Sequence, residues 1–179
     1  MLNTENTLTL VIDFQDRMMP SIDNHEELIR KAAIFIEGSR ILGVPVLTTQ
    51  QYTKGLGETI PTLKKALGDF QPIEKLSFSC IGCDEFEEKL DKAGKKNILI
   101  TGVETHICVQ QTVLHLIERG YHVYLLADCV GSRFEYDKQI ALRRMEQAGA
   151  IITTAESALF EMMVRADHPH RKAISNLVK

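Results

Sequence analysis

The apolar run NILITG, residues 97–102, is the part of this sequence that decides the fold. Branched aliphatic side chains fill it without polar alternation, and Gly102 ends it, which is typical of a strand buried on both faces. The run LTLVI, residues 8–12, has the same character and ends at Asp13. Such strands belong to parallel sheets that helices cover, so the two runs predict the centre of a parallel sheet.

Further short apolar runs alternate with helix-length amphipathic stretches along the chain. We expect strands at 8–12, 44–48, near 73, 97–101, 121–127 and 150–153. We expect helices at 25–42, 84–93, 105–118 and 138–148, and then two short helices that break near His168 and Pro169. Residues 52–59 are predicted to form a surface loop. Strands separated by helices imply βαβ crossovers, and so a doubly wound α/β domain with a parallel sheet covered on both faces.

Length and composition indicate one globular domain, residues 1–179. The 179 residues are 44% hydrophobic and 25% charged, enough for one core but too few for two typical domains. A net charge of −3 gives no electrostatic basis for binding nucleic acid, and no apolar run approaches the ~20 residues that span a membrane. The polar residues 3–7 do not resemble a secretory signal, and four cysteines in that setting predict reduced thiols and a cytoplasmic protein. Neither glycine-rich phosphate-binding motif occurs, which disfavours a nucleotide-binding protein.

Two chemically active residue types stand at the predicted carboxyl ends of strands, where open α/β sheets bind ligands. Asp13 ends the first strand, and Cys108 lies three residues beyond Thr105, a predicted helix N-cap. In a first helical turn, the helix dipole and free N–H groups lower a thiol pKa and can hold a developing oxyanion. Each residue also has a purely structural interpretation, because free cysteines are mostly buried and inert and aspartates often form turns.

Lys75, beside a predicted short strand, completes a chemically consistent set. Taken alone it is most simply a surface lysine. A carboxylate can accept a thiol proton and return it to a leaving amine, while an ammonium group stabilises both anions. The combination of Asp13, Lys75 and Cys108 therefore predicts nucleophilic catalysis by a cysteine.

Three segments resemble the motifs of a known superfamily. These are VIDFQ at 11–15, EKLSFS at 74–79 and TGVETHICV at 101–109, and they resemble the isochorismatase-like cysteine hydrolases, which include nicotinamidases and N-carbamoylsarcosine amidase. The segment QYTKGLG at 51–57 and the end of the chain, from Leu159 to Pro169, are similar to the isochorismatase domain-containing branch. The resemblance runs in order along nearly the whole chain.

The resemblance implies a three-layer α/β fold, with a mostly parallel six-stranded sheet and helices on both faces. It implies that Asp13, Lys75 and Cys108 form a catalytic triad. It also implies a non-proline cis peptide between Val103 and Glu104, which would aim the backbone N–H groups of Glu104 and Cys108 at one oxyanion. The corresponding reaction is hydrolysis of a small-molecule amide through a thioester on Cys108.

The resemblance also bears on the substrate, on cofactors and on partners. The remaining candidates for the substrate pocket are Phe14, Gln15, Tyr52, Phe78, His106 and Ile107. Nicotinamidases bind a metal through a D-x-H motif after the second strand, whereas residues 48–52 here read TTQQY, so we expect no metal and no cofactor. True isochorismatases cleave a vinyl ether without a cysteine nucleophile, so Cys108 favours an amide-type C–N bond. The relatives commonly form homo-oligomers, and we expect the same here.

Two other classes of function remain open. Cys80 and Cys83 form a C-x-x-C pair, the arrangement of a dithiol redox protein, although the acidic residues 84–88 that follow would disfavour a thiolate. The same pair lacks the second half of a zinc site. A catalytically silent binding module on the same fold is the other alternative, and an unreactive Cys108 thiol would identify it.

Overall fold

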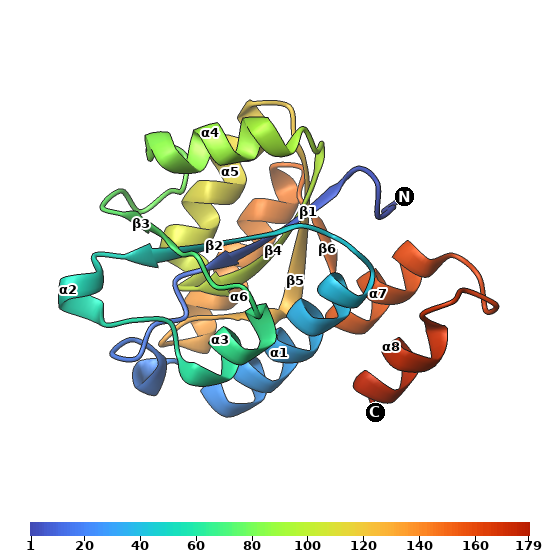
Figure 1. Cartoon of the computed structure of the whole chain (residues 1–179). Helices are drawn as coiled ribbons and strands as arrows, with labels where there is room; N and C mark the ends of the chain where they lie inside the picture. Colours follow the sequence, from blue (N-terminus) through green and yellow to red (C-terminus); the bar gives the residue numbers. More distant parts are fainter.

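Six parallel strands form one sheet in the order β3-β2-β1-β4-β5-β6 (Figure 1). The computed structural model describes all residues, 1–179. The strands are β1 (Thr7–Ile12), β2 (Val46–Gln51), β3 (Ile73–Lys75), β4 (Asn97–Val103), β5 (His122–Gly131) and β6 (Ile151–Thr153). The predicted six-stranded doubly wound sheet is confirmed, and it is entirely rather than mostly parallel.

Helices cover both faces of this sheet. On one face lie α1 (His25–Ile41), α3 (Pro61–Leu67), α7 (Ala155–Met163) and α8 (Arg171–Leu177), and on the other lie α4 (Asp84–Ala93), α5 (Gln110–Glu118) and α6 (Glu135–Gln147). In Figure 1, α1 and α3 lie below the sheet, and α4 and α5 lie above it. The short helix α2 (Thr53–Leu56) lies beyond the end of β2. No helix of this fold has both the length and the apolar character needed to cross a lipid bilayer.

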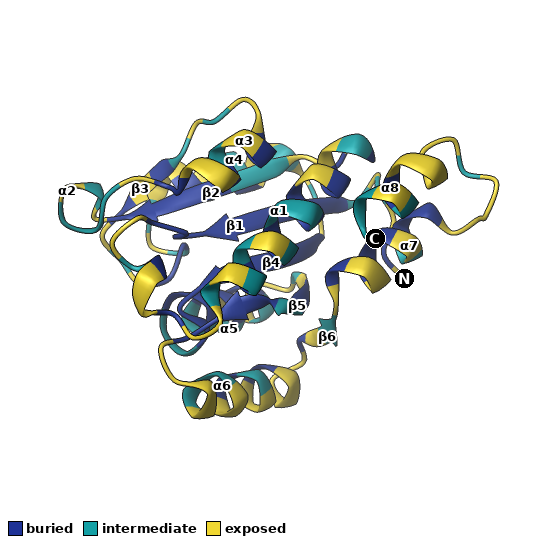
Figure 2. Ribbon diagram, turned by 90° about the horizontal axis from the view of Figure 1, so that it is seen from below, coloured by how far each residue is buried: buried dark blue, intermediate teal, exposed yellow.

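Alternating side chains of the central strands enter different cores. Leu10 and Ile12 of β1 pack in the core beneath α4, α5 and α6, whereas Val11 packs in the core beneath α1 and α3. Every residue of β1 and β4 is buried. Figure 2 shows this contrast, with the central strands dark blue and the outer sides of the helices yellow. Burial on both faces explains why these two strands read as continuous apolar runs.

Three features of the structure differ from the elements predicted from the sequence. Thr105 is not the N-cap, because Glu104 caps a π-helical turn, η2 (Thr105–Val109), which continues into α5. The strand β5 runs on to Gly131, past Cys129, because a bulge between Ile100 and Gly102 lets it follow β4 further. The helix α2 lies within residues 52–59, which were predicted to form a loop because of Gly55 and Gly57, and α3 lies in a stretch for which no element was predicted.

The chain changes its direction of winding between β1 and β4. From β1 the sheet grows through β2 to β3, and from β4 it grows in the opposite direction through β5 to β6. Asp13 follows β1 directly, and Glu104 follows β4. In open α/β sheets, ligands bind outside the carboxyl ends of the strands at such a switch point, so the fold directs attention to these loops.

Candidate active site

Asp13 is fixed at the carboxyl end of β1 with no exposure to solvent. Its backbone has a φ of 56°, a left-handed conformation that aspartate tolerates better than most residues. Its N–H donates to the Thr49 carbonyl, and its Oδ1 accepts a hydrogen bond of 2.7 Å from the Thr49 hydroxyl. The neighbouring strand β2 therefore orients the carboxylate, and Oδ2 remains available for other partners.

Lys75 supplies the cation that this buried carboxylate requires. Its Nζ lies 2.6 Å from Asp13 Oδ2 and donates 2.8 Å and 3.0 Å hydrogen bonds to Gln51 Oε1 and the Phe78 carbonyl oxygen. Lys75 is only 2% exposed. Burial by itself would lower the pKa of the ammonium group, but the charge and hydrogen bond of Asp13, together with the nearby Cys80 and Cys108, outweigh it, and the pKa lies above its usual value. The two residues therefore form a fully hydrogen-bonded buried ion pair.

Cys108 lies in η2, at the start of the helix that follows β4, and the residue is 4% exposed. Burial raises its pKa to about 12, and the negative charge of Asp13 adds to this effect, against the opposing charge of Lys75. The predicted lowering of the thiol pKa is therefore wrong for the resting protein. The thiol is protonated, and Asp13 is the carboxylate beside it that can receive its proton.

The peptide that follows β4 leaves one backbone N–H group without an acceptor. The peptide bond between Val103 and Glu104 is cis. The Glu104 N–H donates to no acceptor within the protein, while its carbonyl oxygen accepts from the N–H groups of Ile107 and Val109. The Glu104 carboxylate is held by Arg133, whose backbone N–H and Nε donate to Oε2 at 3.0 Å and 3.1 Å.

Gly102 sets the close approach of β1 and β4 at this site. Its φ is +154°, and a Cβ there would lie 2.6 Å from Ile12 Cβ and 2.7 Å from the Ile12 carbonyl oxygen. We expect Gly102→Ala to displace the end of β1 and so move Asp13 relative to Cys108. Because a displacement of about 1 Å can cost about 10²-fold in rate, kcat on a hydrolysed amide should fall by that order.

Gly149→Ala is the matched control for that substitution. Gly149 also has a positive φ, +111°, but a Cβ there meets nothing within 4 Å. The Gly149→Ala variant should reproduce the strain of an alanine at positive φ without moving the active-site residues. Equal activity of the two variants would contradict the role assigned to Gly102.

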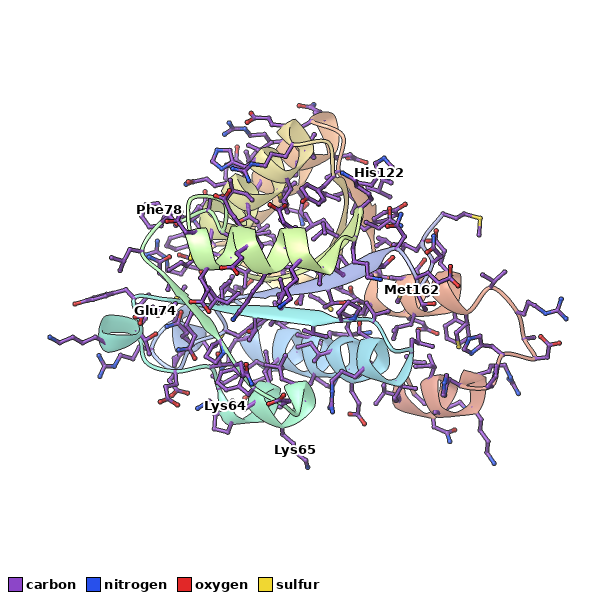
Figure 3. All side chains as sticks on the ribbon, turned by 45° about the horizontal axis from the view of Figure 1, so that its top comes forward. Lys64, Lys65, Glu74, Phe78, His122 and Met162 are labelled. Carbon is purple, nitrogen blue, oxygen red and sulfur yellow. The ribbon has the colours of Figure 1, made fainter.

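A cavity of about 330 Å³ opens beside Cys108. Its walls combine apolar and charged side chains: Arg17, Met18, Ser21, Ile22, Gln51, Leu56, Phe78, Glu104, Ile107, Cys108 and Arg133. Figure 3 shows Phe78 on the same side of the molecule as Glu74 of β3, away from His122 at the start of β5. The cavity thus lies at the carboxyl edge of the sheet, and its volume suits a small molecule.

The six predicted pocket residues divide into two groups. Phe78 and Ile107 line the cavity. The other four lie outside it: Phe14 is buried in the core, Gln15 is buried against β2, Tyr52 is 48% exposed, and His106 is hydrogen-bonded to Ser132. The backbone turn at Asp13 directs the two residues after it away from the cavity, and no sequence signal shows such a turn.

Gln15 and Gln51 stabilise the site through side-chain hydrogen bonds. The Gln15 side chain donates to the carbonyl oxygens of Gln51 and Gly57, and its Oε1 accepts from the Gln51 N–H. Gln51, in the region where nicotinamidases carry metal ligands, uses its side-chain oxygen to accept a hydrogen bond from Lys75. No group of three or more histidine, cysteine or acidic side chains is placed to hold a metal ion.

The C-x-x-C pair has the wrong surroundings for a reactive dithiol. All four cysteines are free. Cys80 is completely buried, and burial raises its pKa to about 12. Cys83 is half-buried and caps α4, whose first turn carries three acidic residues. A redox reaction needs an accessible thiolate, which Cys80 does not provide.

The chain matches a known family over most of its length. Residues 7–157 match the Isochorismatase domain. The chain belongs to the isochorismatase family. It is 37% identical over 179 residues to isochorismatase domain-containing protein 1 of Danio rerio. This match covers 99% of this chain and 62% of that relative. It is 34% identical over 176 residues to isochorismatase domain-containing protein 2A of Mus musculus, and that match covers 98% of this chain and 84% of the relative.

A solved structure of this family fold is similar throughout. The structure titled MAR1 ribonuclease from Caenorhabditis elegans has a TM-score of 0.93 and 38% identity, and the match covers 99% of this chain and 91% of that one. The resemblance stated from the three motifs is therefore confirmed at the level of family and fold. This isochorismatase-family chain spans only 62% of the length of its Danio rerio relative.

Proposed function

We propose that this protein is a cysteine hydrolase that cleaves an amide-type C–N bond of a small molecule. Members of its family are generally hydrolases. The observation that carries the proposal is the buried group at the switch point, where Asp13 is paired with Lys75 at 2.6 Å and the charges of both act on the Cys108 thiol. Burying a carboxylate, a cation and a protonated nucleophile together costs free energy of folding. A catalytic role accounts for keeping them in one site.

The reaction follows from the protonation states. Cys108 gives its proton to Asp13 as its sulfur bonds to the substrate carbonyl carbon, because the free thiolate is disfavoured. The free N–H of Glu104, together with that of Cys108, would hold the oxyanion. The C–N bond then breaks, and the amine leaves with the proton from Asp13. Water gives a proton to Asp13 and attacks the thioester, which releases the acid and returns the proton to the sulfur.

The test is to trap the acyl group on the protein. Wild-type protein is mixed with a panel of small primary and N-substituted amides, quenched in acid and analysed by peptide mass spectrometry. We expect the mass of the acyl group on the peptide that contains Cys108, and none with Cys108→Ala. Cys83→Ala, which removes a half-buried thiol outside the cavity, is the matched control and should keep the adduct. Hydrolysis by Cys108→Ala at the wild-type rate, or an adduct elsewhere, would refute the proposal.

A second candidate function is cleavage of RNA, which one observation favours. The 38% identical structural neighbour carries the name ribonuclease. The net charge of −3 weighs against it, because RNA-binding surfaces neutralise phosphates with basic residues. Incubation of wild type and Cys108→Ala with labelled RNA separates the two functions. Cleavage that depends on Cys108 would place RNA hydrolysis ahead of amide hydrolysis.

A further inference from the structure

The cavity beside Cys108 carries an excess of positive charge. Two guanidinium groups, those of Arg17 and Arg133, and one carboxylate, that of Glu104, line it, which leaves a formal charge of +1. The ion pair of Asp13 and Lys75 behind the cavity is neutral. A protein with a net charge of −3 therefore presents a locally cationic cavity at its candidate active site.

Arg133 keeps most of its donors free for a ligand. Its backbone N–H and its Nε are bonded to one oxygen of Glu104, and neither terminal NH₂ group donates to an acceptor in the protein. Glu104 is 9% exposed on its side chain, whereas Arg133 is 51% exposed, so the carboxylate anchors the arginine and the guanidinium edge extends into the cavity. A planar edge of this kind suits a carboxylate, which accepts two parallel hydrogen bonds from it.

Arg17 is anchored in a similar manner from another loop. Its Nη1 donates to the carbonyl oxygens of Gly55 and, at the limit of hydrogen bonding, Lys54, at 2.7 Å and 3.5 Å. Its Nε and Nη2 have no acceptor in the protein. Two independent loops thus each hold a guanidinium group at the cavity by part of its donors and leave the remaining donors unpaired.

We propose that the substrate is an amide that also carries a carboxylate, and that Arg133 and Arg17 bind this carboxylate while the amide carbonyl faces Cys108. This inference rests on the proposed function. A formal charge of +1 matches a monoanion, whereas a phosphate dianion would leave surplus negative charge next to Glu104 and Asp13. Met18, Ile22 and Leu56 form an apolar wall of the same cavity, which suits a short hydrocarbon part between the two polar ends.

The test compares two alkylating reagents that differ in charge. Iodoacetate is an anion and iodoacetamide is its neutral counterpart, and both form a thioether with Cys108 and release iodide. The rate constant of each at Cys108 is measured by peptide mass spectrometry, and the ratio of iodoacetate to iodoacetamide is taken for each variant. The ratio cancels changes in thiol reactivity, so it isolates the recognition of the carboxylate. Small neutral 2-mercaptoethanol gives the reference ratio for a thiol without a binding site.

We expect the ratio at Cys108 to exceed that of 2-mercaptoethanol by about tenfold, the effect of one charge-assisted hydrogen bond. Arg133→Gln and Arg17→Gln should each lower it toward the reference, and Arg133→Lys should restore it in part. Arg143→Gln, on the exposed side of α6 and outside the cavity, makes the same charge change and should leave the ratio at the wild-type value.

A binding measurement on a second pair of molecules completes the test. Succinamate carries a carboxylate and an amide, and succinamide carries two amides. Succinamate should raise the Tm of wild type and of Arg143→Gln more than succinamide does, and this difference should disappear in Arg133→Gln. An equal response to the anionic and neutral member of both pairs, including no response, overturns the carboxylate site. An acyl adduct on Cys108 combined with such equality refutes this inference alone and leaves the proposed function standing.

Discussion

Asp13→Asn is expected to abolish turnover of a hydrolysed amide and, at the same time, to make the Cys108 thiol more acidic. The two effects have one cause, because Asp13 both receives the thiol proton and raises the pKa of the thiol through its charge. Asparagine has nearly the same shape but cannot accept the proton. Removing a positioned general acid and base costs about 10²–10⁴-fold in kcat, and here the same group serves both half-reactions, so we expect the upper end.

The sign of the accompanying pKa change makes the prediction specific. In the wild type, burial and Asp13 raise the pKa of Cys108 to about 12, while Lys75 opposes them. In the variant, burial and Lys75 remain and the carboxylate is gone, so the pKa falls. The rate of alkylation by iodoacetamide should therefore keep rising with pH beyond pH 9 in the wild type and reach its midpoint at lower pH in the variant. Unfolding would also expose the thiol and lower its pKa toward the ordinary value, so the far-UV circular dichroism of the variant is measured alongside to show that it remains folded.

Thr49→Val is the matched control for this experiment. It removes the 2.7 Å hydrogen bond to Asp13 Oδ1 but keeps the carboxylate, its charge and the shape of the side chain. Turnover should fall much less than in Asp13→Asn, and the pH profile of alkylation should stay close to that of the wild type. Wild-type turnover by Asp13→Asn, or an unchanged thiol pKa in it, would show that Asp13 is not the proton acceptor.

The centre of the sheet was predictable because burial of a strand on both faces produces a recognisable apolar run in the sequence. A strand buried on both faces must be apolar throughout, so residues 8–12 and 97–101 identified β1 and β4 without further information. Asp13 and Cys108 were predicted for a related reason, since polar and nucleophilic residues in the segments that follow such strands fall at the ligand-binding edge. The apolar runs therefore predicted the two central strands, and with them Asp13 and Cys108 in the segments that follow.

The cavity was not predictable by the same means. Arg17 and Arg133 reach it from loops whose paths depend on backbone turns at Asp13 and beyond β5, and neither turn has a periodic signal. The thiol pKa was misjudged because a helix start is visible in the sequence, whereas the burial of Cys108 and its contact with a carboxylate are not. The lining of the cavity and the pKa of the thiol both depend on which residues from distant parts of the chain the fold brings together.

Lys75→Met is expected to destabilise the fold as well as to inactivate the site. The variant keeps the packing volume of the chain but leaves the fully buried Asp13 carboxylate with no cation, and breaking a buried pair in this way costs about 3–5 kcal/mol. Urea denaturation at neutral pH should show this as a lower free energy of unfolding. Loss of the ammonium charge should also remove the one interaction that lowers the pKa of Cys108.

The dependence on pH follows from the direction of the Lys75 shift. The folded protein raises the pKa of Lys75 above its ordinary value of 10.5, so the stabilisation by this residue is complete below that pH and is lost as the pH rises through the folded-state value. The difference between wild type and Lys75→Met should therefore be constant near neutral pH and shrink only in strong alkali.

The double variant Asp13→Asn with Lys75→Met separates stability from chemistry. It removes both charges, so no buried ion is left without a partner, and replacing a whole buried pair is often neutral or stabilising. We expect its free energy of unfolding to recover most of what Lys75→Met loses, while turnover stays as low as in either single variant. A double variant as unstable as Lys75→Met would mean that the ammonium acts through its hydrogen bonds to Gln51 and Phe78 rather than through Asp13.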